Sequence, residues 1–410
     1  MTLPRIMAKA LLNLVDVQVR RGMNTVLDGC SLSVGGAQIV ALTGANGAGK
    51  STLLETAAGL LPMEQGHVKH GEVVVADAEG RRRTSPFTTG MVLQRNGMLG
   101  SEMVSEHLQM AMSMSGHSVD IAPFLKAFNL MHRANDLVAH LSQGQARKVA
   151  VLAGLLPAFA SPTPALVMLD EPDAGLDDAS IETLVGWMGE LCTMGHALLI
   201  ATHDERLVVH ATQLFDVGQN ERQVNTPPAG KKAELRPSRP VKPLSPASFG
   251  VRMHLRTMMW LNTNAMAGLL TLGLFLTMGD FMEELDSLQQ MGFILAPTLA
   301  VGLCGDPLVA ALREERAGVW WRAVGGGEPH AGWMPLAIGA AFTLLSTTGL
   351  GNAREAHVIL TGAVLCFVVW HCVGWMQRST QRLARPHAVF VGLLTPVLIL
   401  PYSILISVLS

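Results

Sequence analysis

The sequence predicts two parts of different fold class: an N-terminal α/β domain built around a phosphate-binding loop, and a C-terminal all-α domain of about five transmembrane helices. Three observations support this division. A glycine-rich loop, Gly44–Thr52, follows a short apolar run. Every lysine lies at or before Lys242, and long intervals beyond Arg256 carry no Asp, Glu, Lys or Arg. The expected segments are the α/β domain at 8–221, a linker at 222–250 and a membrane domain at 251–410.

The composition excludes several classes of protein. The 410 residues are 49% hydrophobic but only 15% charged, whereas about 25% charge is usual in a soluble domain. The formal net charge of −2 argues against a protein that binds nucleic acid through bulk electrostatics. Length and apolar content exclude disorder. The five cysteines show no CxxC or repeated spacing, which excludes a zinc module and a disulfide scaffold.

The glycine-rich loop predicts a phosphate site. An apolar run at 39–43 reads as a buried strand, and the loop after it matches GxxxxGK[ST], followed by the helix-forming stretch Leu53–Ala58. Glycines let successive backbone N–H groups point into one concavity at a helix N-terminus, where phosphate oxygens bind. Lys50 is expected to reach the β- and γ-phosphates, Ser51 to bind Mg²⁺ and Thr52 to line the α/β-phosphate side. The binding residues expected in this loop are Gly44, Asn46, Gly47, Gly49, Lys50, Ser51 and Thr52.

Two further apolar runs end in polar side chains. Ala165–Leu169 leads into Asp170 and Glu171, and Ala197–Ala201 is followed by His203 two residues later. Carboxylates at the carboxyl end of such a strand lie beside the phosphate loop. We expect Asp170 to hold Mg²⁺ and Glu171 to polarise the attacking water, although adjacent carboxylates also occur in solvated turns. His203 can contact the γ-phosphate or the water, or serve a structural role.

The charge-free intervals predict membrane spans. A helix crosses a ~30 Å hydrocarbon core with about 20 apolar residues, and each interval reaches or approaches that length; buried helices of a soluble protein are the alternative. Pro396 and Pro401 can kink the last span or make it re-enter. The intervals are 257–279, 287–305, 329–353, 356–377 and 386–410.

The charges between these intervals predict the topology. Arginines flank the first interval at Arg252 and Arg256, whereas the connection at 280–286 carries only acidic charges. The same alternation continues along the chain, which places the N-terminus in the cytoplasm and the C-terminus outside. No apolar core precedes Asp16, so no cleaved signal peptide is expected. The Pro/Lys-rich stretch 222–250 indicates an extended linker. It is either a solvated tether or a segment whose basic residues bind the anionic lipids of the cytoplasmic leaflet.

The order of these motifs resembles the ATPase domain of ABC transporters over residues 10–215. The matching elements are Gly44–Thr52, Gln94, Leu141-Ser142-Gln143-Gly144-Gln145, Asp170-Glu171, Ala174-Gly175-Leu176-Asp177 and His203. Gln143 stands where the family more commonly has glycine. The resemblance implies ATP and Mg²⁺ as cofactors, with Gln94 binding Mg²⁺ or water.

The resemblance also implies a pair of ATPase domains. Two domains face head to tail, and Ser142, Gly144 and Gln145 of one chain contact the ATP held by Lys50 of the other. Pairing occurs with a second copy or with a related half-transporter. The family usually has an aromatic residue that stacks on adenine; Arg21 occupies the matching region and either stacks its guanidinium on the base or leaves this contact weakened.

The membrane half resembles the ABC-2 type of exporter permease at Leu312–Gly318, a charged segment that in that family forms a short helix docked on the ATPase. Such permeases commonly have six spans rather than five. Asp306 near the second span is interpreted as a capping or interface residue, with a substrate site as the alternative. The predicted function is an ATP-hydrolysing exporter of unknown substrate, a multi-pass protein of the inner membrane that works as a homodimer of half-transporters. A membrane-anchored ATPase that drives envelope assembly or remodelling is the alternative, and a non-hydrolysing nucleotide sensor is a third class.

Overall fold

The computed structural model describes residues 10–227, 236–277, 286–350, 356–379 and 407. It divides into two compact units. The first comprises the residues up to Leu244 together with Glu315–Glu328, and the second comprises Ser245–Glu314 and the residues from Pro329 onward. Charge alone assigned Glu315–Glu328 to the membrane half, so their place in the first unit is a difference from the sequence-based division.

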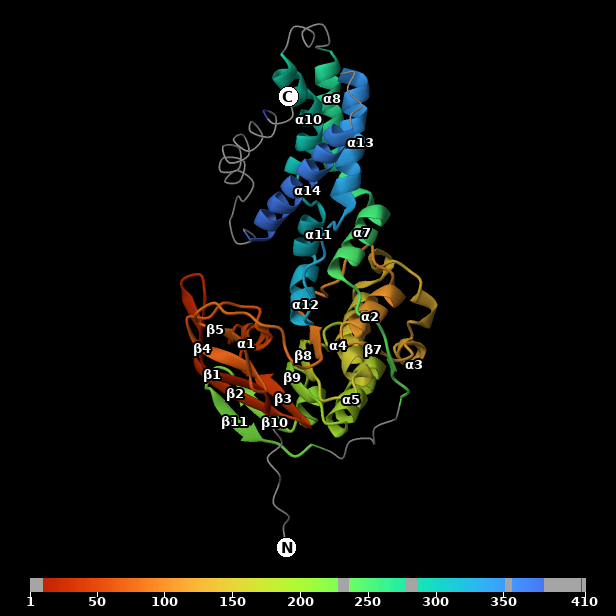
Figure 1. Ribbon diagram of the computed structural model, residues 1–410. Helices are drawn as coiled ribbons and strands as arrows, with labels where there is room; N and C mark the ends of the chain where they lie inside the picture. Colours follow the sequence, from red (N-terminus) through yellow and green to blue (C-terminus); the bar gives the residue numbers. More distant parts are fainter. Residues whose placement is uncertain (1–9, 228–235, 278–285, 351–355, 380–406, 408–410) are drawn as a thin grey trace. The chain divides into compact units, whose positions relative to one another are not determined.

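A six-stranded sheet forms the core of the first unit (Figure 1). Its strand order is β11-β10-β3-β9-β8-β6, and every neighbouring pair except β10–β11 is parallel. The three apolar runs predicted as strands are β3, β9 and β8, which lie side by side. Parallel strands present their carboxyl ends at one edge, so the residues that follow these strands meet there. The strands are β3 (Gln38–Thr43), β6 (Thr89–Val92), β8 (Leu166–Asp170), β9 (Ala197–Ala201), β10 (Gln213–Asp216) and β11 (Glu221–Val224).

A four-stranded antiparallel sheet of order β2-β1-β4-β5 completes the β-structure around the helix α1 (Lys50–Ala57). This helix contacts β1 and β2 on one side and β8 and β9 on the other. It begins at Lys50, before the predicted start at Leu53, because Gly49 caps it in a left-handed conformation. The strands are β1 (Ala10–Arg21), β2 (Asn24–Gly35), β4 (Gln65–His70) and β5 (Val73–Asp77).

The remaining helices of this part pack on the six-stranded sheet and on one another. α4 contacts β6 and β8, α2 packs on α4, and α5 packs on β9. α4 begins at Gln143, because Ser142 and Gln145 form a reciprocal capping box. The elements are α2 (Val104–Ser113), β7 (His117–Ser118), α3 (Ala122–Ala127), 3₁₀ turns at Met131–Arg133 and Val138–His140, α4 (Gln143–Ala160), α5 (Asp178–Thr193) and α6 (Glu205–Val209).

Residues 236–244, which we call the strap, lie bound along these helices. Arg236 donates two hydrogen bonds to the buried carboxylate of Glu190, and its guanidinium carbon lies 4.9 and 4.8 Å from the ring centroids of Phe124 and Phe159. The predicted linker 222–250 therefore differs from a free tether over this stretch, and its first residues belong to β11. Further contacts are the pairing of β12 (Arg239–Pro240) with β7, and hydrogen bonds from Ser238 Oγ to Ala160 O and from Val241 N to Gly116 O.

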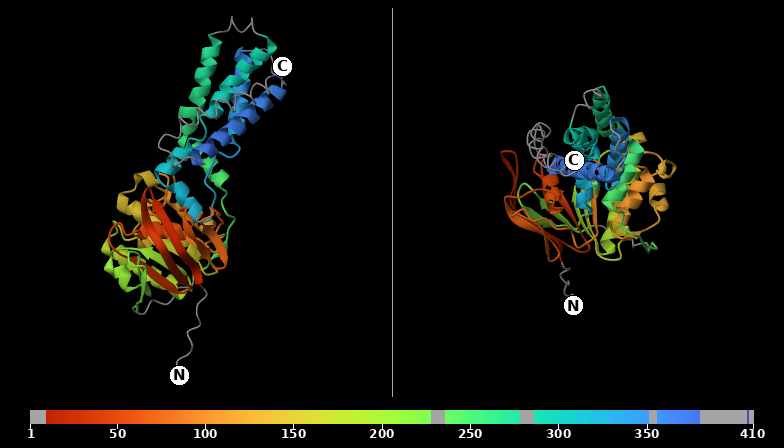
Figure 2. Two further views of the ribbon diagram at one scale, coloured as in Figure 1. Left: turned by 90° about the vertical axis from the view of Figure 1, so that its left-hand side faces the viewer. Right: turned by 45° about the horizontal axis from the view of Figure 1, so that its top comes forward.

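The second unit is helical, and its longer helices run alongside one another (Figure 2). α10 contacts α8, α13 and α14. Small and hydroxyl residues allow this packing: Thr298 and Thr343 share a 2.9 Å hydrogen bond, and a Cβ at Gly362 would lie 1.9 Å from Thr343 Oγ1. The helices are α7 (Pro246–Thr257), a π-turn (Leu261–Ala265), α8 (Met266–Leu276), α10 (Ser287–Leu303), α11 (Leu308–Glu314), α13 (Met334–Leu350) and α14 (Ala356–Ser379).

Two helical segments in the described part of the chain are long and apolar enough to cross a membrane, Gln289–Glu314 and Ala356–Ser379. A third candidate is the pair of helices at 246–257 and 261–276, bent by 66° where Met258 adopts a left-handed φ of +52°. Met334–Gly349 is apolar but shorter. The five predicted spans therefore reduce to two or three by these criteria, and the expected span at 386–410 lies outside the described residues.

Asp306 lies between α10 and α11 and is almost fully buried. Its Oδ1 is 3.0 Å from Nε2 of His254 and accepts a hydrogen bond from Leu308 N, and its Oδ2 accepts one from Arg378 Nη2 at 2.9 Å. The carboxylate thus caps α11 and pairs with α7 and α14, in agreement with the capping interpretation. Buried ionic groups of this kind require such partners.

Candidate functional site

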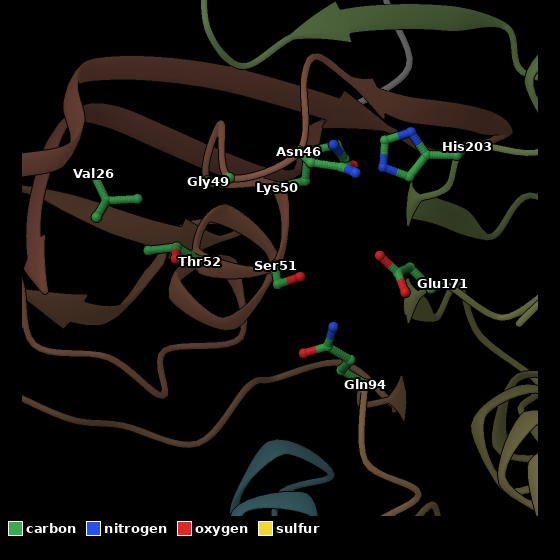
Figure 3. Close-up of a pocket in the computed structure, with 10 residues that line it drawn as sticks. Val26, Asn46, Gly49, Lys50, Ser51, Thr52, Gln94, Glu171 and His203 are labelled. Atoms are coloured by element: carbon green, nitrogen blue, oxygen red, sulfur yellow. The ribbon is translucent and has the colours of Figure 1, made fainter.

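A pocket of about 510 Å³ opens where the strands β3, β8 and β9 end. Every residue that lines it except Val26 was expected from the sequence. Figure 3 shows Ser51, Gln94 and Glu171 facing a common space, with Gln94 and His203 on either side of Glu171. The lining residues are Val26, Asn46, Gly47, Gly49, Lys50, Ser51, Thr52, Gln94, Glu171 and His203.

The phosphate loop has a backbone that requires glycine. Gly44, Gly47 and Gly49 have φ values of +128°, +82° and +100°, which side chains disfavour. A Cβ at Gly49 would also lie 2.9 Å from Cγ1 of Val26, so the loop packs closely on β2. The Lys50 ammonium donates to the carbonyls of Gly44 and Ala45 at 2.8 and 3.0 Å. A positive charge is thereby held beside the N-terminus of α1, an arrangement that favours phosphate.

Asp170 is fully buried at the end of β8. Its Oδ1 accepts a 2.9 Å hydrogen bond from Ser51 Oγ, whereas its Oδ2 has no partner among the described residues. Burial raises the pKa of Asp170 to about 6, and the charge of Glu171 acts in the same direction while the bond from Ser51 opposes it. An orphaned carboxylate oxygen next to a hydroxyl, with Gln94 lining the same pocket, is a donor set that suits Mg²⁺.

Glu171 occupies a strained position. Its φ of +46° lies in the left-handed region, which costs a residue with a side chain roughly 1–2 kcal/mol. Three hydrogen bonds hold it there: Glu171 N donates to Ala201 O at 2.8 Å, and its carbonyl accepts from Ala174 N at 3.0 Å and from Arg147 Nη2 at 2.6 Å. Strain of this kind persists only where the surroundings determine the conformation. The carboxylate is thereby aimed into the pocket.

Ser142, Gly144 and Gln145 lie elsewhere, at the N-terminus of α4. Ser142 is exposed, its Oγ accepts from Gln145 N at 3.3 Å, and Gln145 Oε1 accepts from Ser142 N at 3.0 Å. Among the described residues, none of these three lines the nucleotide-sized pocket. One chain therefore brings together the loop, Asp170, Glu171, Gln94 and His203 but leaves the signature residues outside.

Arg21 forms an ion pair rather than lining the pocket. Its Nη2 lies 3.1 Å from Oε2 of Glu55 on α1, and half of its side chain is exposed. Its contact with adenine remains a prediction. Val26, which the sequence reasoning missed, supplies apolar surface inside the pocket instead. Val26 lies near the start of β2, and no motif in the sequence marks it.

Residues 315–328 pack on the first unit beside Gln94. Their helix α12 (Ala317–Ala323) buries Trp320, whose Nε1 donates to Met91 O at 3.0 Å and whose ring centroid lies 5.0 Å from that of His107. A Cβ at Gly97 would lie 2.8 Å from Cβ of Trp320. The segment thus touches β6 and the loop that follows Gln94.

The same segment is joined to the phosphate-loop helix by charge. Arg316 Nη1 lies 2.8 Å from Oε1 of Glu55, which is almost fully buried on α1. The sequence placed the docking helix at Leu312–Gly318, but the helix begins at Ala317. Arg316 adopts a left-handed φ of +57°, which separates α12 from α11 and assigns the two helices to different units.

Comparison with known proteins agrees with this geometry. Residues 27–174 match the family model described as ABC transporter. The ABC-type transporter ATP-binding protein EcsA of Bacillus subtilis is 33% identical over 201 residues, which cover 47% of this chain and 77% of that protein. The cytochrome c biogenesis ATP-binding export protein CcmA of Gluconobacter oxydans is 34% identical over 197 residues, 47% of this chain and 81% of that protein. The glutamate/aspartate import ATP-binding protein GltL of Escherichia coli is 31% identical over 219 residues, 51% of this chain and 88% of that protein.

Proposed function

The chain belongs to the ABC transporter family through its N-terminal ATP-binding domain, which is an ATPase, and on this premise we propose that it is a half-transporter that uses ATP to export a solute across a membrane. The proposed location is the inner membrane, with the ATPase domain in the cytoplasm. Relatives carry both export and import names, so the preference for export rests on the resemblance of the membrane half to exporter permeases.

The observation that carries the proposal is the position of residues 315–328. In the sequence they stand between the apolar helices α10 and α13, yet they fold into the ATPase unit. Trp320 contacts the loop after Gln94, and Arg316 contacts Glu55 on the phosphate-loop helix. A change at the nucleotide can thus reach residues 315–328 through packing within the ATPase unit, and these residues are covalently continuous with the apolar helices.

The chemistry proposed for the pocket follows from the charges and donors in it. Ser51, Asp170 and Gln94 would hold Mg²⁺, which when bound neutralises charge on the phosphates. Lys50 and the loop N–H groups bind and orient the phosphates. Glu171 orients and polarises the attacking water, and His203 contacts the γ-phosphate or that water. Phosphoryl transfer depends mainly on such positioning and charge stabilisation.

The signature residues supply the reason for proposing a dimer. The N-terminus of α4 offers N–H donors and a positive dipole end to an anion, but it lies outside the chain's own pocket. We therefore infer that Ser142, Gly144 and Gln145 complete the pocket of a second copy, and that theirs complete this one. A related half-transporter in place of the second copy is the competing outcome.

Complementation tests the shared site. We expect Lys50→Ala and Ser142→Arg each to abolish ATP hydrolysis when expressed alone. In a mixed dimer, one pocket combines the intact Lys50 of one chain with the intact Ser142 of the other, so mixing should restore activity to a measurable fraction of the wild-type rate. Failure of co-expressed, co-purified chains to hydrolyse ATP would contradict the homodimer with composite sites.

Reconstitution tests transport. Purified protein in liposomes should hydrolyse ATP and accumulate members of a broad solute panel when the ATPase domain faces the outside medium, and Glu171→Gln should stop both. Turnover retained in Glu171→Gln would refute the role of Glu171. Hydrolysis without movement of any solute would instead favour a membrane-anchored ATPase that drives envelope assembly or remodelling.

A further inference from the structure

Arg147 is a buried arginine that none of the recognised ATPase motifs includes. It lies in the second turn of α4, five residues after Ser142, and its side chain is 5% exposed. Its guanidinium donates through Nη1 to Leu93 O at 2.7 Å and to Asn96 Oδ1 at 3.2 Å. Through Nη2 it donates to the carbonyls of Asp170 and Glu171. One planar group therefore joins three separate segments.

These segments carry the groups around the reacting phosphate. Leu93 immediately precedes Gln94, and the other two carbonyls belong to the carboxylate pair itself. Glu171 has a left-handed backbone that no helix or strand maintains. Its N–H is fixed by Ala201 O, and its carbonyl accepts from Ala174 N within the same turn and from Arg147, a donor on a distant element. With both backbone groups held, the direction of the Glu171 side chain is determined.

The placement of this cation is energetically demanding, which argues against an incidental role. Burial lowers the pKa of Arg147, while the charges of Asp170, Asp173 and Glu171 oppose that shift. Its hydrogen-bond acceptors are three backbone carbonyls and one amide oxygen rather than a carboxylate. The two terminal nitrogens make all four bonds, while Nε has no partner among the described residues. A planar guanidinium is required to reach all four acceptors at once.

We propose that Arg147 is a positioning residue for ATP hydrolysis, which fixes Glu171 and the residue before Gln94 and links both to the helix that begins at Ser142. This inference rests on the proposed role of Glu171 as the group that polarises water. When the N-terminus of α4 engages a nucleotide on a second copy, Arg147 carries the resulting movement to the carboxylate. Hydrolysis then depends on closure of the dimer.

The test uses Arg147→Lys, which keeps the positive charge but removes the planar guanidinium and its paired N–H donors. We expect kcat of the full-length protein to fall about 10- to 100-fold while KM for ATP changes less than about threefold, because the phosphate loop and Lys50 are untouched. The matched control is Arg133→Lys, since Arg133 makes a half-buried ion pair with Asp136 in the same part of the fold. Its kcat should stay within twofold of wild type. Asn96→Ala, which removes one of the four acceptors at a half-buried position, should lower kcat by about two- to fivefold.

The Glu171→Gln background separates the possible failures. If Glu171→Gln retains turnover, the proposed function of Glu171 fails. If Glu171→Gln abolishes turnover but Arg147→Lys leaves kcat unchanged, the inference on Arg147 is wrong and the proposed function stands. Positioning through Glu171 also predicts that Arg147→Lys adds no further loss to the residual rate of Glu171→Gln. If Arg147→Lys lowers kcat equally in the wild-type and Glu171→Gln backgrounds, or raises KM as much as it lowers kcat, its role is structural and the inference is overturned. If Arg147→Lys does not fold, the same comparison is made with Asn96→Ala.

Discussion

Replacing Gly97 with alanine should loosen residues 315–328 from the ATPase unit. The new Cβ would lie 2.8 Å from Cβ of Trp320 and 3.2 Å from its Cγ, whereas ordinary carbon contacts are about 3.5–4.0 Å. Trp320 is almost fully buried and has no exposed side toward which to rotate. The indole must therefore retreat by roughly 1 Å. That movement breaks the bond from Nε1 to Met91 O.

Two contributions set how much more Gly97→Ala destabilises the packing than a control glycine substitution with the same backbone penalty. Overpacking of a core contact costs roughly 1–3 kcal/mol, and the lost hydrogen bond adds about 1 kcal/mol. Gly97 also has a φ of +73°, which penalises alanine by a further ~1–2 kcal/mol. Gly80→Ala is the matched control, because Gly80 has a φ of +83° and no atom within 4 Å of an added Cβ. We expect Gly97→Ala to exceed its control by about 2 kcal/mol, equivalent to a roughly 30-fold change in an opening equilibrium.

Hydrogen exchange read by mass spectrometry measures this opening. The amides of Trp320 and Val324 bond to Arg316 O and Trp320 O, so they exchange slowly while α12 is packed and faster when it leaves. Peptides covering 315–328 should exchange roughly 30-fold faster in Gly97→Ala than in Gly80→Ala. Equal exchange in the two variants would refute the packing argument.

Three further predictions concern stability. Arg236→Ala leaves the buried Glu190 carboxylate without that partner. The free energy that holds the strap in place should fall by about 3 kcal/mol, seen as faster hydrogen exchange at 236–244. Burial lowers the pKa of His196 from 6.5 to about 4. Between these two pH values the unfolded state binds more protons than the folded state. The free energy of unfolding, measured by urea titration, should therefore fall by about 1.4 kcal/mol for each pH unit as the pH is lowered from 6.5 to 4. Asp306→Asn breaks the pairs with His254 and Arg378 and should lower the stability of the second unit by about 3 kcal/mol, measured by thermal unfolding in detergent.

Each of these has a control on the same chain. Arg239→Ala alters an exposed residue of the strap and should leave exchange at 236–244 unchanged. His196→Gln removes the titrating group, so its unfolding free energy should lose most of the slope between pH 6.5 and 4; an unchanged slope would assign the pH dependence to other groups. Asp286 caps α10 by accepting a 2.8 Å hydrogen bond from Gln289 N, and Asp286→Asn keeps this N-cap, since Asn and Asp cap equally well. A loss there as large as that of Asp306→Asn would show that the buried pairs contribute little.

Local sequence predicted the parts of the site that are local in the chain. The loop Gly44–Thr52 forms the phosphate site because its glycines and the following helix are contiguous, and their backbone preferences suffice to shape it. The apolar runs before Asp170 and His203 became neighbouring strands, so their carboxyl ends meet. The charge distribution likewise placed a boundary at about residue 250, close to Ser245 where the second unit begins, since water and lipid act on composition rather than on precise packing.

Contacts between distant segments depended on the tertiary structure. Trp320 bonds to Met91 across 229 positions, and Arg147 joins Leu93 to Asp170 across separate elements; neither pairing has a periodic or spaced pattern that a single sequence reveals. Burial is the main cause that raises the pKa of Asp170, and burial is a property of the assembled core. The sequence by itself determined that this protein has a phosphate-binding ATPase domain followed by an apolar half. Only the tertiary structure decided which side chains line the pocket of the ATPase domain and which segment of the apolar half folds with that domain. Both depend on how helices and strands that are distant in the chain pack against one another.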